Sequence, residues 1–294
     1  MNLSAERNKI LRALHWWFAA EAKPHPVVRV LEGGRPAGPA AAYFMEAPRL
    51  ILVLEGRATF LAVVDQKEMR FDVVPGQILF LAQYTWISPV PRVPYRSLGV
   101  TFRADSTRLI ITTRPAMAAD GTVADRRVAQ WSTRETLGPK GDQLLQLLRS
   151  EPSRRLGERT FGPLVEILLA EVADLVETAP AHERASRAVL WQMVSDYLAE
   201  HWSDPQLSRK STASYFSRHP NHFSRFFHTH AKKNFRTYLN EIRLERSMQF
   251  LRDLRYNVGD VATLCGFTDL PHFIHCFRLR FGFTPGEYRK RHER

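Results

Sequence analysis

The sequence contains few cysteines and no long apolar segment. Its two cysteines, Cys265 and Cys276, are too few for a disulfide framework and fit a reducing compartment. We expect them to be small core residues rather than a redox switch. No stretch reaches the roughly 18 consecutive apolar residues of a membrane span. Residues 1–20 mix charges with helically spaced apolar positions, unlike a cleavable signal peptide. We therefore expect a cytoplasmic protein that does not enter a membrane.

Histidine is absent from a long central part of the chain. There is none between His25 and His182, which disfavours a catalytic metal held by a histidine cluster in this region. Histidines do gather at positions 219, 222, 228 and 230, but their spacing matches no standard zinc pattern. No paired carboxylate or nucleophile–base arrangement supports catalysis. The sequence thus predicts no catalytic residue, no metal, no cofactor and no enzymatic activity.

Positive charge is concentrated in the last third of the chain. The net charge is +12, and residues 186–294 hold 18 Lys and Arg against 10 Asp and Glu, a net charge of +8. This distribution is typical of a nucleic-acid-binding domain, although basic domains also bind anionic membranes. With an ordinary apolar fraction of 44%, a chain of 294 residues predicts two globular domains.

The stretch 258–289 predicts two short helices and the start of a third. Gly266 and Gly282 end the first two helices, because glycine adopts positive φ without penalty. Asp269 is a candidate N-cap, and residues 284–287 form a capping box. A small-residue helix, a glycine turn and a helix with an aromatic stripe are typical of a helix-turn-helix unit. The stripe is Phe273, Phe277 and Phe281.

The same pattern occurs about fifty residues earlier. Ala213 and Ser217 precede Ala262 and Gly266 by 49 positions, and the later matches are offset by 50. We therefore expect two helix-turn-helix units in tandem, joined by a long helix. The matches at the larger offset pair Phe223, Arg225, Phe227, Asn234, Phe235 and Tyr238 with Phe273, His275, Phe277, Thr284, Pro285 and Tyr288.

The order and spacing of these residues resemble the C-terminal signature of the AraC/XylS family of bacterial transcription regulators. The resemblance covers residues 186–294 and implies binding of double-stranded DNA. Activation is commoner than repression in this family, and an activator would also contact RNA polymerase. The matching positions are Ala262, Gly266, Phe267, Phe273, Phe277, Arg278, Gly282, Thr284, Pro285, Tyr288 and Arg289.

Two positions depart from the family's pattern. Lys232 stands where glycine usually follows the first recognition helix, so a positive φ there would be mildly strained. His219 stands before Pro220, where serine is usual, and is a weaker cap. Both departures bear on the angle of the first unit.

Residues 49–112 alternate short β-rich runs with turns, which predicts a small barrel or sandwich. Residues 53–60 and 73–82 are similar to the cupin-like sensory domain common in the family. An effector pocket inside the barrel would be lined by aromatic side chains, although each of these more often simply fills the core. The predicted strands are 49–54, 58–64, 68–73, 77–81 and 96–102. The pocket candidates are Phe44, Phe60, Phe71, Phe80, Tyr84 and Trp86.

The predicted fold is α+β: an N-terminal cupin-like β-barrel with accessory helices, and a C-terminal all-α domain. Periodicity predicts helices within 139–178. In the family that the sequence resembles such helices often form the dimer face, for which the candidates are Leu164, Leu168, Val172 and Leu175, although core packing explains these residues equally well. The predicted domains are 1–178 (sensory and dimerisation), 179–186 (linker) and 187–294 (DNA-binding). The two helix-turn-helix motifs lie at about 208–231 and 258–281, and the long helix between them runs from Asn234 to about Leu254.

If the phenylalanines of each recognition helix face the core, the intervening residues face DNA. We expect more hydrogen-bonded base reading from the first helix, and more shape and methyl contacts from the second. The base-contact candidates are Asn221, His222, Ser224, Arg225, His228, Leu270, Pro271, Ile274 and His275. The phosphate-contact candidates are Arg218, Lys232, Lys233, Arg278, Arg280 and Arg289.

The leading hypothesis is a sequence-specific transcription activator whose N-terminal domain responds to a small-molecule effector. A homodimer through helices in 139–178 is compatible with it. The alternatives are a nonspecific or constitutive DNA-binding protein without an effector and, less favoured, a cupin-type enzyme with the C-terminal half as a tether.

Overall fold

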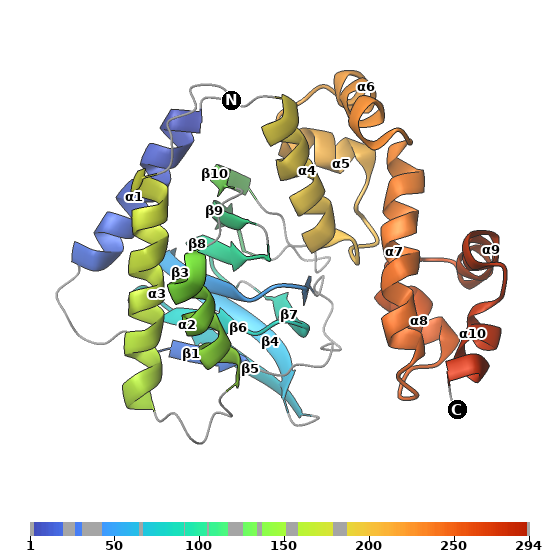
Figure 1. Cartoon of the computed structure of the whole chain (residues 1–294), viewed down its shortest axis with the longest axis horizontal. Helices are drawn as coiled ribbons and strands as arrows, with labels where there is room; N and C mark the ends of the chain where they lie inside the picture. Colours follow the sequence, from blue (N-terminus) through green and yellow to red (C-terminus); the bar gives the residue numbers. More distant parts are fainter. Residues whose placement is uncertain are drawn as a thin grey trace. The chain divides into compact units, whose positions relative to one another are not determined.

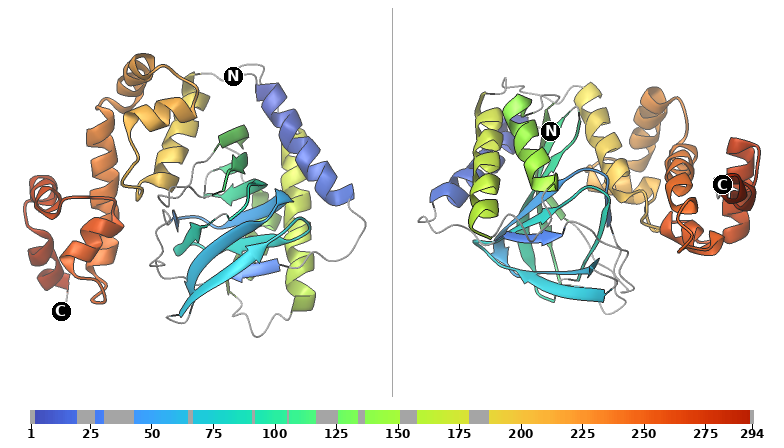
Figure 2. Two further views of the ribbon diagram at one scale, coloured as in Figure 1. Left: turned by 180° about the vertical axis from the view of Figure 1, so that it is seen from behind. Right: turned by 60° about the horizontal axis from the view of Figure 1, so that its bottom comes forward.

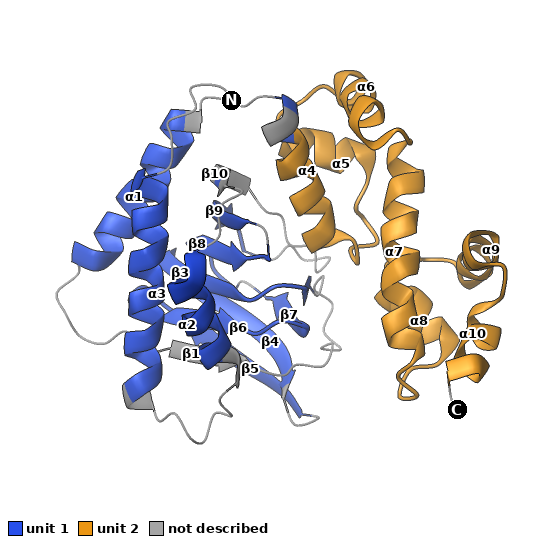
Figure 3. Cartoon of the chain, in the orientation of Figure 1, with its two compact units in different colours: residues 1–190 blue, residues 191–294 orange. Residues whose placement is uncertain are grey.

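The chain divides into two compact units, residues 1–190 and 191–294 (Figure 3). The division falls within the helix Arg187–His201 (α4), whereas the sequence prediction placed all of that helix in the second domain. The predicted linker, 179–186, lies outside the described residues. The structure, a computed structural model, describes residues 3–19, 27–30, 43–64, 67–90, 92–104, 106–116, 126–133, 137–150, 158–178 and 187–292.

The described strands of the N-terminal unit form two sheets. All neighbouring strands pair antiparallel, except β1 with β6, which pair parallel. The larger sheet has the order β1 (Val27–Val30), β6 (Ile78–Leu81), β3 (Arg49–Gly56), β8 (Tyr95–Phe102), β9 (Thr107–Arg114), β10 (Arg126–Thr133). The smaller sheet has the order β2 (Tyr43–Met45), β7 (Thr85–Pro89), β4 (Ala58–Val64), β5 (Lys67–Val73).

The five predicted strands are confirmed as β3, β4, β5, β6 and β8, with ends that differ by no more than two residues. The prediction assigned no bounds to the other five strands. It placed β9 inside the β-rich region without assigning it, and it assigned nothing to β10. The α+β fold class is therefore correct.

Both faces of the larger sheet are buried, because side chains alternate along each strand. On β3, Leu50 and Leu52 pack toward helices, whereas Val53 packs toward the smaller sheet. On β6, Phe80 likewise packs toward the helices and Leu79 toward the smaller sheet. A strand buried on both faces reads as an unbroken apolar run, which explains the sequence of 50–54.

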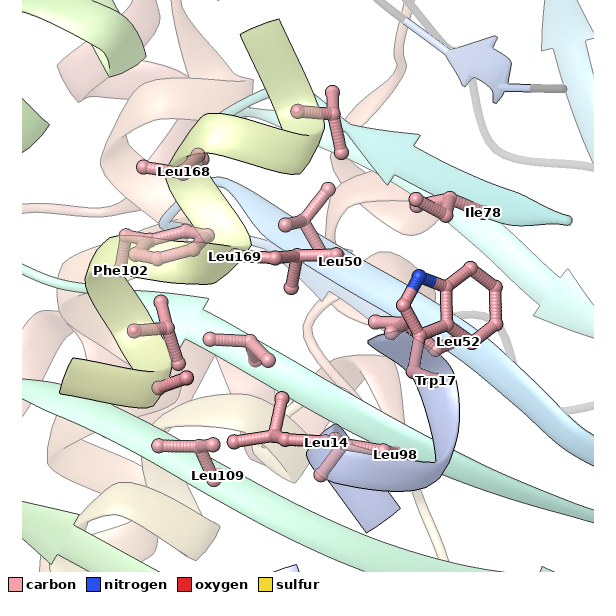
Figure 4. Packing of buried hydrophobic residues seen from close by; sticks show 14 of the residues in the cluster. Leu14, Trp17, Leu50, Leu52, Ile78, Leu98, Phe102, Leu109, Leu168 and Leu169 are labelled. Atoms are coloured by element: carbon pink, nitrogen blue, oxygen red, sulfur yellow. The ribbon is translucent and has the colours of Figure 1, made fainter. Parts of the chain in front are cut away.

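Three helices cover the outer face of the larger sheet: α1 (Leu3–Ala19), α2 (Gly138–Ser150) and α3 (Glu158–Thr178). Figure 2 shows α2 and α3 side by side over this face. Leu14 and Trp17 of α1 are almost fully buried among Leu52, Leu98 and Leu109 of the strands (Figure 4). The main core of the N-terminal unit therefore lies between helices and sheet.

The last turn of α3 is bonded to α1. Arg7 donates from Nε to the carbonyl of Val176 at 2.7 Å and also bonds the carbonyl of Glu177. His15 Nε2 lies 2.7 Å from the Glu177 carboxylate. Carbonyls at a helix C-terminus have no partner within the helix. Arg7 of α1 supplies hydrogen-bond donors for two of these carbonyls in the last turn of α3.

The candidate dimer face on α3 is mostly core. Leu168 and Val172 are fully buried in their own unit, and Leu164 and Leu175 are partly buried against the same cluster. The hypothesis of a contact between copies through these four residues is therefore wrong for Leu168 and Val172. The spacing that suggested it is the spacing of any helix that packs on a sheet.

We expect Leu168→Ala to lower the free energy of unfolding by about 2–5 kcal/mol, because it leaves a cavity in the core. The matched control is Ile167→Ala, whose side chain is 43% exposed and whose loss should change stability by no more than about 0.5 kcal/mol. Urea denaturation of the full-length protein would measure both values. Equal, small effects would contradict the packing described for α3.

The second unit is all-helical, as predicted. Its helix α7 (Phe235–Leu251) ends before the predicted Leu254. The Asp253 carboxylate accepts a bond from the Arg255 backbone N–H at 3.0 Å and pairs with the Arg255 side chain at 2.6 Å. These bonds lower the pKa of the Asp253 carboxyl and stabilise a turn that competes with further helix. The other helices are α4 (Arg187–His201), α5 (Arg209–Tyr215), α6 (Pro220–Ala231), α8 (Val258–Leu264), α9 (Leu270–Phe281) and α10 (Pro285–His292).

Within this unit, Figure 1 shows α6 beside the beginning of α7 and α9 beside its later part. Helix α7 therefore connects two similar helical groups, as expected for tandem units. None of the helices in the described ranges combines the length and the apolar character that crossing a membrane requires.

Candidate nucleic-acid interface

The two short helices α5 and α8 end in the same turn. In the first helix-turn-helix unit the Arg218 N–H bonds the Ala213 carbonyl at 2.8 Å. In the second helix-turn-helix unit the Phe267 N–H bonds the Ala262 carbonyl at 3.0 Å. The residue before each donor has positive φ, 52° at Ser217 and 74° at Gly266. The internal repeat predicted at an offset of 49 residues is thus confirmed at atomic level.

The predicted caps of both recognition helices are also present. The Asp269 carboxylate accepts the His272 backbone N–H at 2.6 Å, and His219 Nδ1 accepts that of Asn221 at a longer 3.3 Å. The longer bond agrees with the expectation that His219 is the weaker cap.

The two recognition helices also end alike. Lys232 and Gly282 each adopt the left-handed conformation and donate to the carbonyl four residues earlier, at 2.9 and 2.8 Å. Lys232 has φ of 57°, so the expected strain at this position is present.

A phenylalanine pair anchors each recognition helix. Phe223 and Phe227 of α6, and Phe273 and Phe277 of α9, are at most 2% exposed. In both pairs the ring centroids lie 5.8 Å apart, within the range of favourable aromatic contact. Because this face is held in the core, the opposite face of each helix is directed outward.

On α6 the side chains predicted to read bases are mostly exposed. Asn221, His222, Arg225 and His228 are exposed, and Arg225 Nη2 lies 3.3 Å from His222 Nδ1. These side chains offer both donors and acceptors, so this face can hydrogen-bond base edges.

Ser224 is the exception among the α6 candidates. It is half-buried, accepts a bond from Arg209 Nη1 at 2.6 Å and donates to the Pro220 carbonyl at 2.9 Å. The hydroxyl therefore serves mainly to hold α6 against α5. The sequence reasoning did not consider Arg209, a basic residue at the start of α5 whose partner lies 15 positions away.

The outward face of α9 is less polar. Leu270, Pro271 and His275 are exposed, and Ile274 is half-buried. Leu279, which the sequence reasoning did not select, is 74% exposed. The sequence pattern could have identified Leu279 as exposed, because an apolar residue midway between Phe277 and Phe281 lies off the buried stripe.

The phosphate candidates differ in how far they are engaged within the domain. Arg218, Lys232 and Arg278 are exposed. The other three candidates already have partners. Lys233 pairs with Glu241 at 2.6 Å, Arg280 with Glu245 at 3.3 Å, and Arg289 bonds backbone carbonyls.

Arg289 is turned into the domain rather than outward. Its Nε donates to the Leu251 carbonyl at 3.1 Å and its Nη2 to the Tyr256 carbonyl at 2.6 Å. Two of its donors therefore hold the end of α7 and the following turn. The sequence prediction of a phosphate contact ignored this, because both partners lie more than thirty positions away.

Both cysteines belong to the second helix-turn-helix unit. Cys265 is fully buried, and burial raises the pKa of the half-buried Cys276 thiol. Both features slow reaction with oxidants, which require a thiolate. Over the described ranges, no group of three or more His, Cys, Asp or Glu side chains is placed to hold a metal ion.

The six aromatic residues proposed for an effector pocket do not line one surface. Phe60 and Phe71 pack together between the two sheets, with ring centroids 5.9 Å apart. Phe80 lies on the opposite face of the larger sheet, against Phe161 of α3 at 5.6 Å. Strand alternation separates residues that the sequence reasoning had grouped by type.

The other three aromatics form a separate group on the smaller sheet. Phe44 contacts Trp86 at 5.0 Å and Tyr84 at 6.2 Å. Met45 of β2 and Ile87 of β7 face the space between the sheets, so Phe44 and Trp86 face away from it. The prediction of one pocket lined by all six is therefore wrong.

Comparison with known proteins finds a matching family model and several similar proteins. The family model described as a helix-turn-helix domain matches residues 212–291. The uncharacterised HTH-type transcriptional regulator YpdC of Escherichia coli (strain K12) is 27% identical over 91% of both chains. The HTH-type transcriptional activator RhaS of Enterobacter sp. (strain 638) is 28% identical over 50% of this chain and 51% of its own. A solved transcriptional regulator with an AraC-type DNA-binding domain, from Chromobacterium violaceum, is 24% identical, with a TM-score of 0.32, and covers 34% of this chain and 89% of that one.

Two helix-turn-helix units in tandem, each with a buried aromatic stripe and an exposed recognition face, define a DNA-binding protein. The chain carries a helix-turn-helix domain over residues 212–291 and resembles transcription regulators of the AraC/XylS family.

The turns of the two units predict opposite effects of glycine exchange. Ser217→Gly should raise the free energy of unfolding by about 0.5–1 kcal/mol, because it removes left-handed strain. Gly266→Ala should lower it by about 2 kcal/mol or more. The new Cβ would lie 2.9 Å from the Ser203 carbonyl oxygen and 3.0 Å from Arg243 Nη2.

Gly282→Ala is the matched control, since Gly282 has φ of 82° but no atom within 4 Å of the added Cβ. It should cost only about 1 kcal/mol. Urea denaturation followed by far-ultraviolet circular dichroism would give all three values. A loss at Gly266 no larger than that at Gly282 would contradict the close packing of the second turn.

Proposed function

We propose that this protein is a sequence-specific transcription activator, controlled by a small-molecule effector bound to its N-terminal unit. The observation that carries the proposal is the pair of exposed recognition faces on α6 and α9, repeated within one compact unit. RhaS, to which part of this chain is similar, is a transcriptional activator, which supports activation and hence contact with RNA polymerase.

In this proposal α6 and α9 enter successive major-groove segments of double-stranded DNA. Arg225 bonds guanine O6 and N7, and Asn221 reads adenine or contacts phosphate. Leu270 and Ile274 touch thymine methyl groups, beside His275. The polar face of α6 and the more apolar face of α9 support an unequal division, with hydrogen-bonded specificity concentrated in the first half-site.

Phosphate contacts fix the register and carry no base preference. We assign them to Arg218, Lys232 and Arg278, whose side chains are exposed. Lys233 and Arg280 can exchange their surface partners for phosphate, since surface ion pairs contribute little. Arg289 is assigned to holding the domain together instead.

For the N-terminal unit we propose a cupin-like fold whose effector lies between the two facing sheets. The buried core between these sheets, which includes Phe60 and Tyr95, supports that location. A homodimer would use the exposed side chains Leu147 of α2 and Ile167 of α3, which are 46% and 43% exposed. A cytoplasmic location, away from membranes, completes the proposal.

Selection of genomic fragments by the purified full-length protein, at near-physiological salt, tests the proposal. We expect a recurrent asymmetric site of roughly 20 base pairs, protected over two adjacent major-groove segments. A specific regulator should prefer this site over other DNA by at least about a thousandfold. Binding that depends on salt but selects no sequence would instead identify a nonspecific DNA-binding protein.

A pair of substitutions separates base reading from phosphate contact. Arg225→Ala should weaken binding to the selected site by about 1–3 kcal/mol and relax the preference at one base pair. Arg218→Ala should weaken binding to all sequences alike and reduce the slope of log affinity against log salt by about one. Titrations on the selected site and a scrambled duplex would measure both. If Arg225→Ala lost the same affinity on both duplexes, Arg225 would not read a base.

A further inference from the structure

Arg243 is a buried arginine in the middle of α7. Its residue is 8% exposed, and it follows Phe235 and Leu239 at four-residue intervals on the inward stripe of the helix. Arginine is rarely buried unless its donors are satisfied. Its contacts therefore show what this position does.

The guanidinium of Arg243 bonds to the first helix-turn-helix unit. Nε donates to the Trp202 carbonyl and Nη2 to the Asp204 carbonyl, each at 2.8 Å. Both carbonyls lie just after α4, in the turn that leads into α5. Two bonds from one planar group fix its orientation as well as its position.

The same guanidinium lies against the turn of the second unit. A Cβ on Gly266 would lie 3.0 Å from Arg243 Nη2, so the glycine backbone packs directly on it. Arg243 Cζ also lies 5.8 Å from the centre of the Phe267 ring, close enough for an attractive cation–π contact. One side chain thus contacts the end of α4 and the turn between α8 and α9.

The charge state supports this role. Burial lowers the pKa of Arg243, while the nearby Asp204 and Cys265 act in the opposite direction. An arginine nevertheless stays protonated at neutral pH. Its donors are therefore always present, and the contact does not switch off with pH in the physiological range.

A helix alone cannot fix the arrangement of the two units. The 17 residues of α7 form a rod of about 25 Å, which sets the distance between the units. Each unit packs on α7 through contacts of its own, such as that of Phe227 with Phe235 in the first unit. Arg243 in addition joins the backbone that leads into the first unit to the turn of the second.

We propose that Arg243 is a positioning residue that holds the two helix-turn-helix units in one relative orientation and thereby sets the spacing of the two DNA segments they read. The inference rests on the proposed function, because it requires a site with two segments. It differs from base reading, since Arg243 is buried and contacts protein on both sides.

Arg289 provides a matched control. It also donates through Nε and Nη2 to two backbone carbonyls, those of Leu251 and Tyr256. These partners are the end of α7 and the loop before α8, and Arg289 belongs to α10, so the contact lies within the second unit. Losing it should weaken that unit without releasing it from the first.

The experiment uses the fragment recovered by genomic selection, with one or two base pairs inserted or deleted between its two protected segments. Affinities of the full-length protein for these duplexes define a spacing preference. We expect the wild type to lose at least about tenfold in affinity per inserted base pair, because each step also rotates one segment about the DNA axis, at 10–10.5 base pairs per turn.

Arg243→Met should reduce that loss to within about threefold, with weaker binding to the native spacing. Arg243→Lys should reduce the loss of affinity per inserted base pair to a similar extent, since an ammonium group lacks the planar pair of donors. Arg289→Met should keep the wild-type spacing preference even where its overall affinity falls. Circular dichroism and thermal unfolding would establish that each variant is folded at the assay temperature.

The outcomes separate the inference from the proposed function. A wild type without a two-segment site would overturn the proposed function itself. A wild type with strict spacing and an Arg243→Met variant that is equally strict would overturn the inference alone. The inference alone would also be overturned if Arg289→Met lost the spacing preference to the same extent as Arg243→Met. If Arg243→Met is unfolded, Arg243→Lys decides, and failure of both to fold would show that Arg243 maintains the fold rather than the arrangement of folded units.

Discussion

Burial of the paired phenylalanines determines what each recognition helix can offer to DNA. Phe223 and Phe227 orient α6, and Phe273 and Phe277 orient α9, through ring contacts with the same centroid distance of 5.8 Å. Once these faces are held in the core, the side chains on the opposite face of each helix must point outward. The caps, the turns and the left-handed residues then determine where each helix begins and ends. The functional surface is therefore a consequence of packing, and its chemistry is free to differ between the two units.

The sequence was sufficient for features that depend on near neighbours. Positive φ at Gly266 and Gly282, the Asp269 cap and the 284–287 capping box were all predicted, and each involves residues within four positions. The capping bond from the Thr284 backbone also lowers the pKa of the Glu287 carboxyl. The internal repeat was equally visible, because it compares the sequence only with itself.

Features that depend on distant partners were not predictable in the same way. The separation of Phe60 from Phe80 requires knowing which face of each strand meets the helices. Arg243 meets carbonyls 39 and 41 positions away. Its only local signal is a charged residue at an inward position of α7, which sequence reasoning passed over. Arg289 was misread for the same reason, since a basic residue near DNA resembles a phosphate ligand until its carbonyl partners are seen.

The bonds between α1 and the end of α3 have a consequence for synthesis of the chain. Arg7 and Glu177 are 170 positions apart, so the bonds between α1 and the end of α3 cannot form until nearly the whole N-terminal unit has been made. Leu14 and Trp17 of α1 pack among Leu52, Leu98 and Leu109, so their partners also come from strands made later than α1. The C-terminal unit relies on contacts among consecutive helices, which form quickly. The two units thus differ in how much of the chain must be made before their stabilising contacts can form.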